Sequence, residues 1–165
     1  MTIRFCKTLL VAAVALFYSI VVFNNITDYT SNYLFVSHVL SMDSTFPGNQ
    51  GMWRAVHSIF IYRAFYASII CWETLTALLS WAGAVSLLRK LKAPVEAFNR
   101  AKGISVGAFT LSLLMWLVAF LTVGAEWFLM WQSKTWNGQE AAFRMFTVVG
   151  IILIFLTMPD VEGQP

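Results

Sequence analysis

Four long apolar runs constrain the fold of this chain more than any other feature. They lie at about residues 8–26, 59–88, 104–131 and 142–158. A helix of about 20 apolar residues spans the ~30 Å hydrocarbon core of a bilayer. Charged residues make up only 12% of the 165 positions, about half of their share in a soluble domain. We therefore predict an all-α, polytopic membrane protein, in which residues 1–165 form a single domain built as a bundle of four transmembrane helices.

The first run is also where a signal peptide would lie. Arg4 and Lys7 precede it, as the basic start of a signal peptide would. No small-residue cleavage site follows, because the chain continues with Asn24, Asn25 and Ile26. We therefore expect an uncleaved first span.

The segment between the first two spans is the longest one outside the membrane. Its residues 33–40 form an apolar and aromatic stretch that is too short to cross a bilayer. Pro47 and Gly48 then favour a turn. This pattern predicts a long first outer loop that contains a short helix lying in the membrane interface.

The distribution of Lys and Arg predicts the orientation. Seven of the eleven basic residues precede the first span or lie between the second and third: Arg4, Lys7, Arg89, Lys90, Lys92, Arg100 and Lys102. Short segments rich in Lys and Arg stay in the cytoplasm, so both termini are expected there. The last residues, from Asp160 onward, are expected only to end the chain.

Four charged side chains within the spans are the candidate functional residues: Arg63, Glu73, Glu126 and Arg144. A charge at the centre of a membrane helix costs about 2.5 to 3.5 kcal/mol on insertion scales, so it normally faces the bundle interior or water. At ~1.5 Å per residue, Glu73 and Arg144 lie at one height, roughly 24 Å from the cytoplasmic ends of their helices. Glu126 and Arg63 lie nearer the outer ends. We therefore predict two pairs, Glu73 with Arg144 and Glu126 with Arg63.

This intramembrane cluster allows two interpretations. Its members form interior ion pairs that fix which helices pack together, or they line a polar pocket that opens to the outside beneath a roof of His38 and Asp43. Glu73 is expected to face other helices, because small residues follow it at helical spacing: Thr76, Ala77, Ser80 and Ala84. Gly103 and Gly107 have the GxxxG spacing that could receive this small-residue face.

No pattern typical of catalysis, metal binding or cofactor binding is found in the sequence. His38 and His57 lie far apart, with no acidic or cysteine residue at ligand spacing, and no zinc, phosphate-loop or triad motif occurs. We therefore predict a non-enzyme without catalytic residues, metal or cofactor. Nucleic acid is not an expected partner either, because the basic residues flank apolar runs instead of forming a patch with exposed aromatics.

Four stretches of the sequence resemble a known family. They read FNNITDY at 23–29, VLSMDSTFPG at 39–48, EWFLMWQS at 126–133 and TWNGQ at 135–139. They are similar to the bacterial family of predicted small integral membrane proteins of unknown function, and the similarity covers nearly the whole chain. The resemblance implies four spans and a place in the bacterial inner membrane. It implies no activity and no catalytic residues.

Three functions are compatible with these observations. The first is a non-enzymatic accessory or structural subunit that packs with lipid, another membrane protein or a second copy of itself. The second is a small-solute or proton-linked transport or sensing module in which Glu73 titrates. The third is a quinone- or haem-binding membrane anchor, which would rest on His38, His57 and the many aromatic residues.

Overall fold

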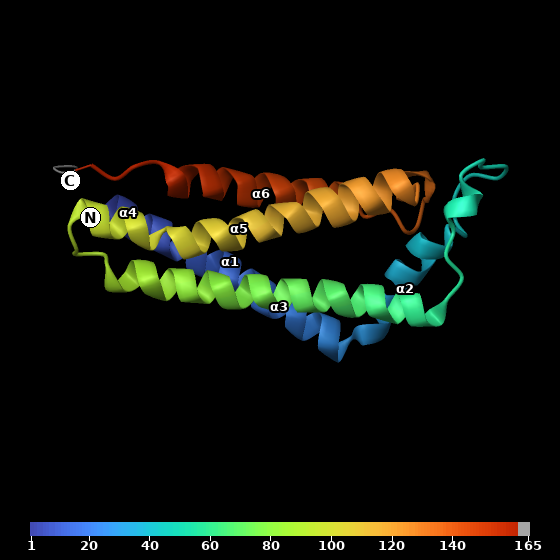
Figure 1. Cartoon of the computed structure of the whole chain (residues 1–165), viewed down its shortest axis with the longest axis horizontal. Coiled ribbons are helices and arrows are strands. Elements are labelled where there is room, and N and C mark those ends of the chain that lie inside the picture. Colours follow the sequence, from blue (N-terminus) through green and yellow to red (C-terminus); the bar gives the residue numbers. More distant parts are fainter. Residues whose placement is uncertain (162–165) are drawn as a thin grey trace.

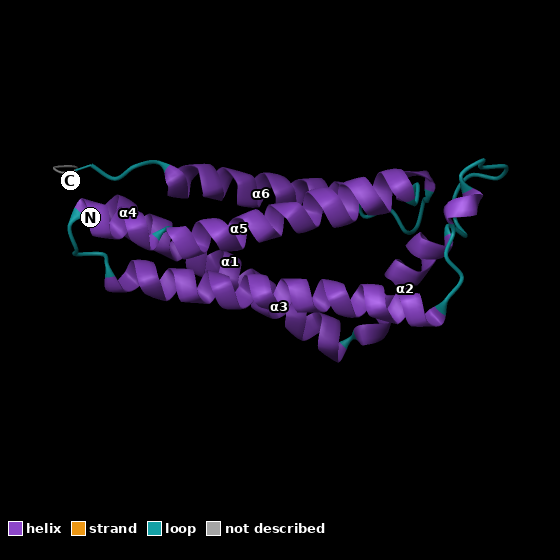
Figure 2. Ribbon diagram, in the orientation of Figure 1, coloured by secondary structure: helices purple, strands orange, loops and turns teal. Residues whose placement is uncertain are grey.

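The computed structural model describes residues 1–161, and all regular structure in that range is helical (Figure 2). Four helices there are long and apolar enough to cross a membrane: Thr2–Thr27, Ile59–Arg89, Val95–Trp127 and Gln139–Thr157. They are α1, α3, the succession of α4 (Val95–Ala101), α5 (Gly103–Leu114) and η2 (Met115–Trp127), and α6. The predicted all-α architecture with four membrane-spanning helices is confirmed. The first and third spans begin earlier than predicted, because their basic flanking residues are helical as well.

The four spans lie side by side, and the loops that connect them lie at the two ends of the bundle (Figure 1). α6 lies along α5 and η2, while α3 packs against both α5 and α1. α1 runs obliquely behind the other helices and ends beside α3, on the side away from α6. The N-terminus, the α3–α4 connection and the last described residues gather at one end, which we call the basic end. The connections 42–58 and 128–138 gather at the other, the loop end.

Each span buries a side chain at every seventh position along one face. These positions are Val11, Tyr18 and Asn25 in α1; Tyr66, Glu73, Ser80 and Leu87 in α3; Ser105 and Ser112 in α5; and Ala142, Val149 and Leu156 in α6. A seven-residue recurrence is typical of helices that cross at about 20°. It fixes the rotation of each helix about its own axis, and therefore which side chains reach the interior.

α3 and α5 approach each other closely at Gly83. A Cβ atom added to Gly83 would lie 3.0 Å from the backbone nitrogen of Ser105, so a side chain there would force the two helices apart. Gly103 and Gly107, by contrast, face away from α3, and a Cβ at either would have no neighbour within 4 Å. The expectation that the GxxxG pair receives the small face of α3 is therefore wrong. Ser105 and Ser112, on the seven-residue face of α5, are buried instead.

The part of the third span nearer the loop end is a π-helix, η2 (Met115–Trp127). At its end the backbone N–H of Phe128 donates to the carbonyl of Val123 at 3.0 Å. This bond joins residues five positions apart, which is the spacing that defines a π-helix. π-Helical turns are rare and occur often at functional sites. Nothing in the apolar sequence of this run distinguishes it from an α-helix.

A second helix follows α1 after a break at Asp28. This helix, α2 (Tyr29–Ser41), is longer than the predicted stretch 33–40 and ends at Met42 in the left-handed conformation. Val36, Val39 and Leu40 are its buried residues, and it packs against α3. The predicted helix in the first loop is confirmed, whereas its place in the membrane interface stays a prediction.

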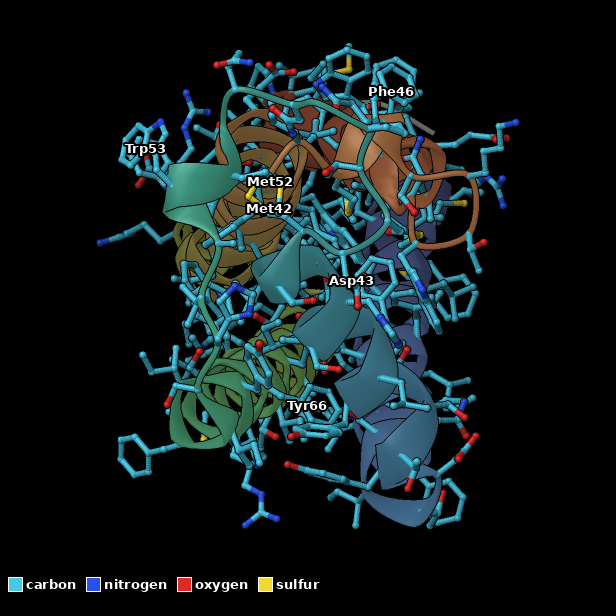
Figure 3. The ribbon with its side chains drawn as sticks, turned by 90° about the vertical axis from the view of Figure 1, so that its right-hand side faces the viewer. Met42, Asp43, Phe46, Met52, Trp53 and Tyr66 are labelled. Carbon is cyan, nitrogen blue, oxygen red and sulfur yellow. The ribbon has the colours of Figure 1, made fainter. Side chains whose placement is uncertain are left out.

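The connection after α2 closes the loop end. Arg54 Nη1 donates to the carbonyl oxygen of Trp127 at 3.2 Å, and its guanidinium lies 5.2 and 5.0 Å from the rings of Trp53 and Trp127. Figure 3, which looks onto this end, shows Trp53 at the edge of the bundle and Met42, where the connection begins, further inside. The segment is therefore anchored to η2 and does not hang free.

A buried ionic cluster joins three helices at the basic end. Asp160 Oδ2 lies 3.0 Å from Lys7 Nζ of α1 and 2.6 Å from Lys102 Nζ before α5. Both lysines also donate to the carbonyl oxygen of Met158, at 2.6 and 2.9 Å. The residues are nearly inaccessible, with 2% of Lys7, 5% of Lys102 and 7% of Asp160 exposed. The expectation that the chain from Asp160 onward only ends the protein is thus wrong for Asp160; residues 162–165 lie outside the described range.

The ionic cluster makes stability depend on pH. Burial by itself would raise the pKa of Asp160, but Lys102 and Lys7 outweigh it and hold the pKa below the ordinary value. The stabilisation is complete above the pKa of an unfolded aspartate, about 4. It is lost as the pH falls from there through the lowered pKa of the folded state. In detergent micelles, we expect the unfolding-temperature difference between wild type and Asp160→Asn to shrink only below about pH 4. A constant difference down to about pH 3 would contradict this.

Candidate functional site

Of the four charged residues predicted within the spans, only Glu73 is buried. It is 3% exposed, whereas Arg63, Glu126 and Arg144 are exposed. Arg144 Nη2 pairs with Glu140 Oε1 on its own helix at 3.3 Å. Among residues 1–161, neither predicted pair, Glu73 with Arg144 or Glu126 with Arg63, is formed, so that part of the prediction is wrong.

The rotation of α6 explains why Arg144 does not reach Glu73. The buried face of α6 carries Ala142, Val149 and Leu156. Arg144 follows Ala142 by two residues and therefore points to nearly the opposite side of the helix. Counting residues gives heights along a helix but leaves its rotation undetermined.

Glu73 is held by a network of neutral side chains. Asn25 Nδ2 of α1 donates to Glu73 Oε2 at 2.6 Å. Asn25 Oδ1 accepts from Asn32 Nδ2 of α2 at 2.5 Å and from the hydroxyl of Tyr66 at 3.2 Å. Because the oxygen of Asn25 receives two donors, its amide nitrogen is directed at the carboxylate. Three helices thus position one acid.

Asn25 is not among the predicted site residues, although the sequence contains a signal that its side chain is buried. Asn25 follows Val11 and Tyr18 at seven-residue spacing, and all three are buried. A polar residue that continues an apolar seven-residue face is expected to point into the bundle. Its long-range partner, Glu73, has the same kind of position on α3, between Tyr66 and Ser80.

A cavity of about 260 Å³ lies beside Glu73. All four spans and α2 contribute to its lining. Its polar part consists of Asn25, Asn32, Tyr66 and Glu73, and Trp116 and Phe120 of η2 contribute aromatic rings. The sequence prediction of a pocket containing Glu73 therefore has a structural counterpart, built from different neighbours than those predicted.

The second oxygen of Glu73 has no protein partner. In the described part of the chain Oε1 accepts no hydrogen bond, and it is not sealed from the cavity by neighbouring atoms. No Lys, Arg or His lines the cavity. A carboxylate in a low-dielectric interior is costly unless a cation neutralises it or it takes up a proton. The arrangement can therefore bind a proton or a ligand that brings positive charge.

The predicted roof residues, His38 and Asp43, lie together but do not line this cavity. His38 Nδ1 is 2.7 Å from Asp43 Oδ2, and the His38 ring stacks on Trp136 at 4.5 Å between centroids. Figure 3 shows Asp43 at the end of α2, apart from Tyr66. The cavity is covered instead by Asn32 and other residues of α2. The prediction that His38 and Asp43 roof the Glu73 pocket is wrong, because α2 continues from α1 toward the loop end and carries both residues beyond the cavity (Figure 1).

No side-chain cluster suited to a metal appears between residues 1 and 161, where no three His, Cys, Asp or Glu residues converge. His38 is engaged by Asp43 and Trp136, and His57 is exposed on the loop end. The quinone- or haem-binding alternative therefore gains no support from the positions of the two histidines.

The chain matches a family model. This model, described as "Predicted small integral membrane protein (DUF2165)", covers residues 3–159. No curated protein and no solved structure matches the chain.

Proposed function

The chain belongs to this family of small integral membrane proteins of unknown function, and from that premise we propose that it is a non-enzymatic module that binds a small ligand for transport or sensing. The site is the cavity around Glu73. One observation carries the proposal: a carboxylate that is 3% exposed faces an intramembrane cavity with one oxygen unpartnered and no cation beside it. Ionisable residues inside a membrane commonly mark substrate, ion or proton pathways.

The lining of the cavity favours binding over catalysis. Apart from Glu73, its polar members are Asn25, Asn32 and Tyr66, and these are already bonded to one another or to Glu73. A reaction would need a nucleophile or a second acid or base within reach of Glu73. A single carboxylate can instead release a proton when a ligand binds and take it up again when the ligand leaves. This exchange is the simplest mechanism of coupled transport or sensing.

Reaction with a hydrophobic carbodiimide tests whether Glu73 is reachable. Dicyclohexylcarbodiimide enters bilayers and modifies carboxyl groups that it can contact. We expect mass spectrometry of the protein in lipid vesicles to find Glu73 modified despite its burial, and no modification at position 73 in Glu73→Gln. Glutamine can still accept the bond from Asn25, so this variant should fold. Glu126→Gln, which changes an exposed acid, is the matched control and should leave the modification of Glu73 unchanged.

The absence of this reaction would contradict the proposed binding site. If Glu73 stays unmodified while the exposed Glu126 and Glu140 react, the cavity is not open to lipid-soluble molecules, and the proposed binding function is wrong. A vesicle flux assay in which wild type is active tests transport. If Glu73→Gln transports as fast as wild type, Glu73 has no role in transport.

An accessory or structural role is the second candidate. The observation in its favour is the exposed position of Gly103 and Gly107, where an added Cβ would meet nothing within 4 Å. Small residues at this spacing let two membrane helices approach closely. A protein that migrates alone in gentle detergent, and gives no crosslinked species in native membranes, would contradict this role.

We also propose that the protein resides in the bacterial inner membrane with its basic end in the cytoplasm. The support is the gathering of Lys and Arg residues at that end. Cys6 is exposed there, so in a Cys71→Ser background a membrane-impermeant maleimide should label Cys6 only after cells are lysed. Labelling of Cys6 in intact spheroplasts would show that the basic end lies outside the cytoplasm and would contradict the proposed orientation.

A further inference from the structure

We infer that the ligand of the Glu73 cavity is a lipophilic organic cation, with an ammonium group on an aromatic or compact apolar body. The inference rests on the proposed function, because it names the ligand class of the same cavity. It draws on three features of the cavity: the sign of its charge, its aromatic lining and its volume.

The charge of the cavity favours a cation. Among residues 1–161, Glu73 is the only one with a full charge that lines it. The amino end of α6 also reaches the cavity through Gly138 and Ala141, and its dipole carries about half a positive charge. A full negative charge outweighs that partial charge, and the three neutral side chains around Asn25 add none. An anionic ligand would meet the carboxylate without compensation.

The aromatic lining suits an ammonium group. Trp116 and Phe120 lie 4.8 Å apart between ring centroids, and Phe35 of α2 lies 6.5 Å from Phe120. These three rings continue one another along the cavity, and Tyr66 contributes a fourth beside Glu73. Aromatic faces attract ammonium groups through the ring quadrupole, most strongly where water is excluded. Aromatic rings together with one acid form the usual chemistry of organic-cation recognition.

The cavity also has room for an apolar body. An engineered apolar cavity of about 150 Å³ holds benzene, so about 260 Å³ accommodates a larger molecule. A second, apolar crevice adjoins it and shares Phe35, Ile69 and Phe120. That crevice offers only about 30 Å³. The apolar body of the ligand therefore lies in the larger cavity, together with the ammonium group.

Binding of benzyltrimethylammonium tests the inference directly. The radiolabelled cation is titrated onto the purified full-length protein in lipid nanodiscs, and neopentylbenzene, its uncharged carbon isostere, is the competitor. We expect saturable binding that unlabelled cation displaces and neopentylbenzene does not. Glu73→Gln should lower the affinity by at least about 10-fold, since it removes the only full charge. Glu126→Gln should leave it within about 2-fold.

A second pair of variants separates ring chemistry from apolar volume. Phe120→Leu keeps an apolar side chain in the cavity but removes one aromatic face, and should weaken binding of the cation by about 2- to 30-fold. Phe143→Leu changes an exposed ring on α6 and should have no effect. The unfolding temperatures of all four variants are compared with wild type, so that a loss of binding is not mistaken for a loss of fold.

The outcomes distinguish this inference from the proposed function. If neopentylbenzene displaces the cation as well as unlabelled cation does, the site does not select charge and the inference is wrong, while the binding function stands. If carbodiimide modifies Glu73 but the cation shows no Glu73-dependent binding, the inference is again wrong. If Glu73 also resists carbodiimide, both fail.

Discussion

Replacing Asp160 by alanine should destabilise the detergent-solubilised protein by about 3 kcal/mol or more, because it strands two buried lysines without a counter-charge. Lys7 and Lys102 both reach Asp160 Oδ2, at 3.0 and 2.6 Å, and both lysine side chains are nearly inaccessible to solvent. The loss should appear in equilibrium unfolding by denaturing detergent in mixed micelles. Far-ultraviolet circular dichroism of the native state should stay helical, since the spans themselves do not depend on the cluster.

A matched acid on the same end of the bundle provides the control. Glu96 pairs with Arg100 at 3.9 Å, but both side chains are almost fully exposed. Glu96→Ala should therefore change stability by less than about 0.5 kcal/mol, as for other exposed pairs one turn apart. Adding Lys102→Met to Asp160→Ala should restore part of the lost stability, because the stranded charge is removed with it. If Asp160→Ala behaves like Glu96→Ala, the buried cluster does not stabilise the fold.

The number of spans and the special status of Glu73 could be predicted from the sequence, because both depend on local composition. A run of apolar residues is recognised without knowledge of its neighbours. Glu73 is conspicuous because a charge in such a run is rare, and its small-residue face correctly predicts burial. Height along a helix follows equally simply from the rise per residue.

The partners of Glu73 could not be predicted in the same way, because they depend on helix rotation. Successive residues turn by about 100° around a helix, so Arg144 lies at the right height but on the exposed face. Asn25, 48 positions earlier in the chain, supplies the contact instead. The seven-residue recurrence of buried positions would have placed Asn25 inside and Arg144 outside. The π-helical turns of η2 have no comparable signal in the sequence.

The partners of Asp160 also could not be predicted from the residues near it in the sequence. Its sequence neighbours are Pro159 and Val161, which indicate only the end of an apolar run. Its hydrogen-bonded partner Lys7 lies 153 positions away. The two meet because an even number of spans returns the end of α6 to the side where α1 begins. Topology thus brings together a charge pair that no spacing rule within one segment could suggest.

Replacing Gly83 by alanine should also be strongly destabilising, by about 1 to 3 kcal/mol, the usual cost of an overpacked core. The new methyl group would lie 3.0 and 3.1 Å from the backbone N and Cα of Ser105 and would collide with its hydroxyl. A side chain can rotate away, but the backbone of α5 cannot yield without moving the helix. The contact lies in the interface between α3 and α5, so the change should lower the unfolding temperature.

Gly107→Ala is the matched glycine-to-alanine change, at an exposed position of α5, the helix that Gly83 of α3 contacts. A Cβ at Gly107 meets nothing within 4 Å, and alanine is favoured over glycine in a helix by about 1 kcal/mol, so this variant should be as stable as wild type or more so. Ser105→Gly combined with Gly83→Ala should recover only part of the loss, because it removes the hydroxyl but leaves the backbone contacts. Equal effects of Gly83→Ala and Gly107→Ala on the unfolding temperature would contradict the rotation of α5 about its axis, in which Gly107 faces away from α3. The burial of Ser105 and Ser112 depends on that rotation, as does the position of Trp116 and Phe120 beside Glu73, because η2 continues α5 without a break.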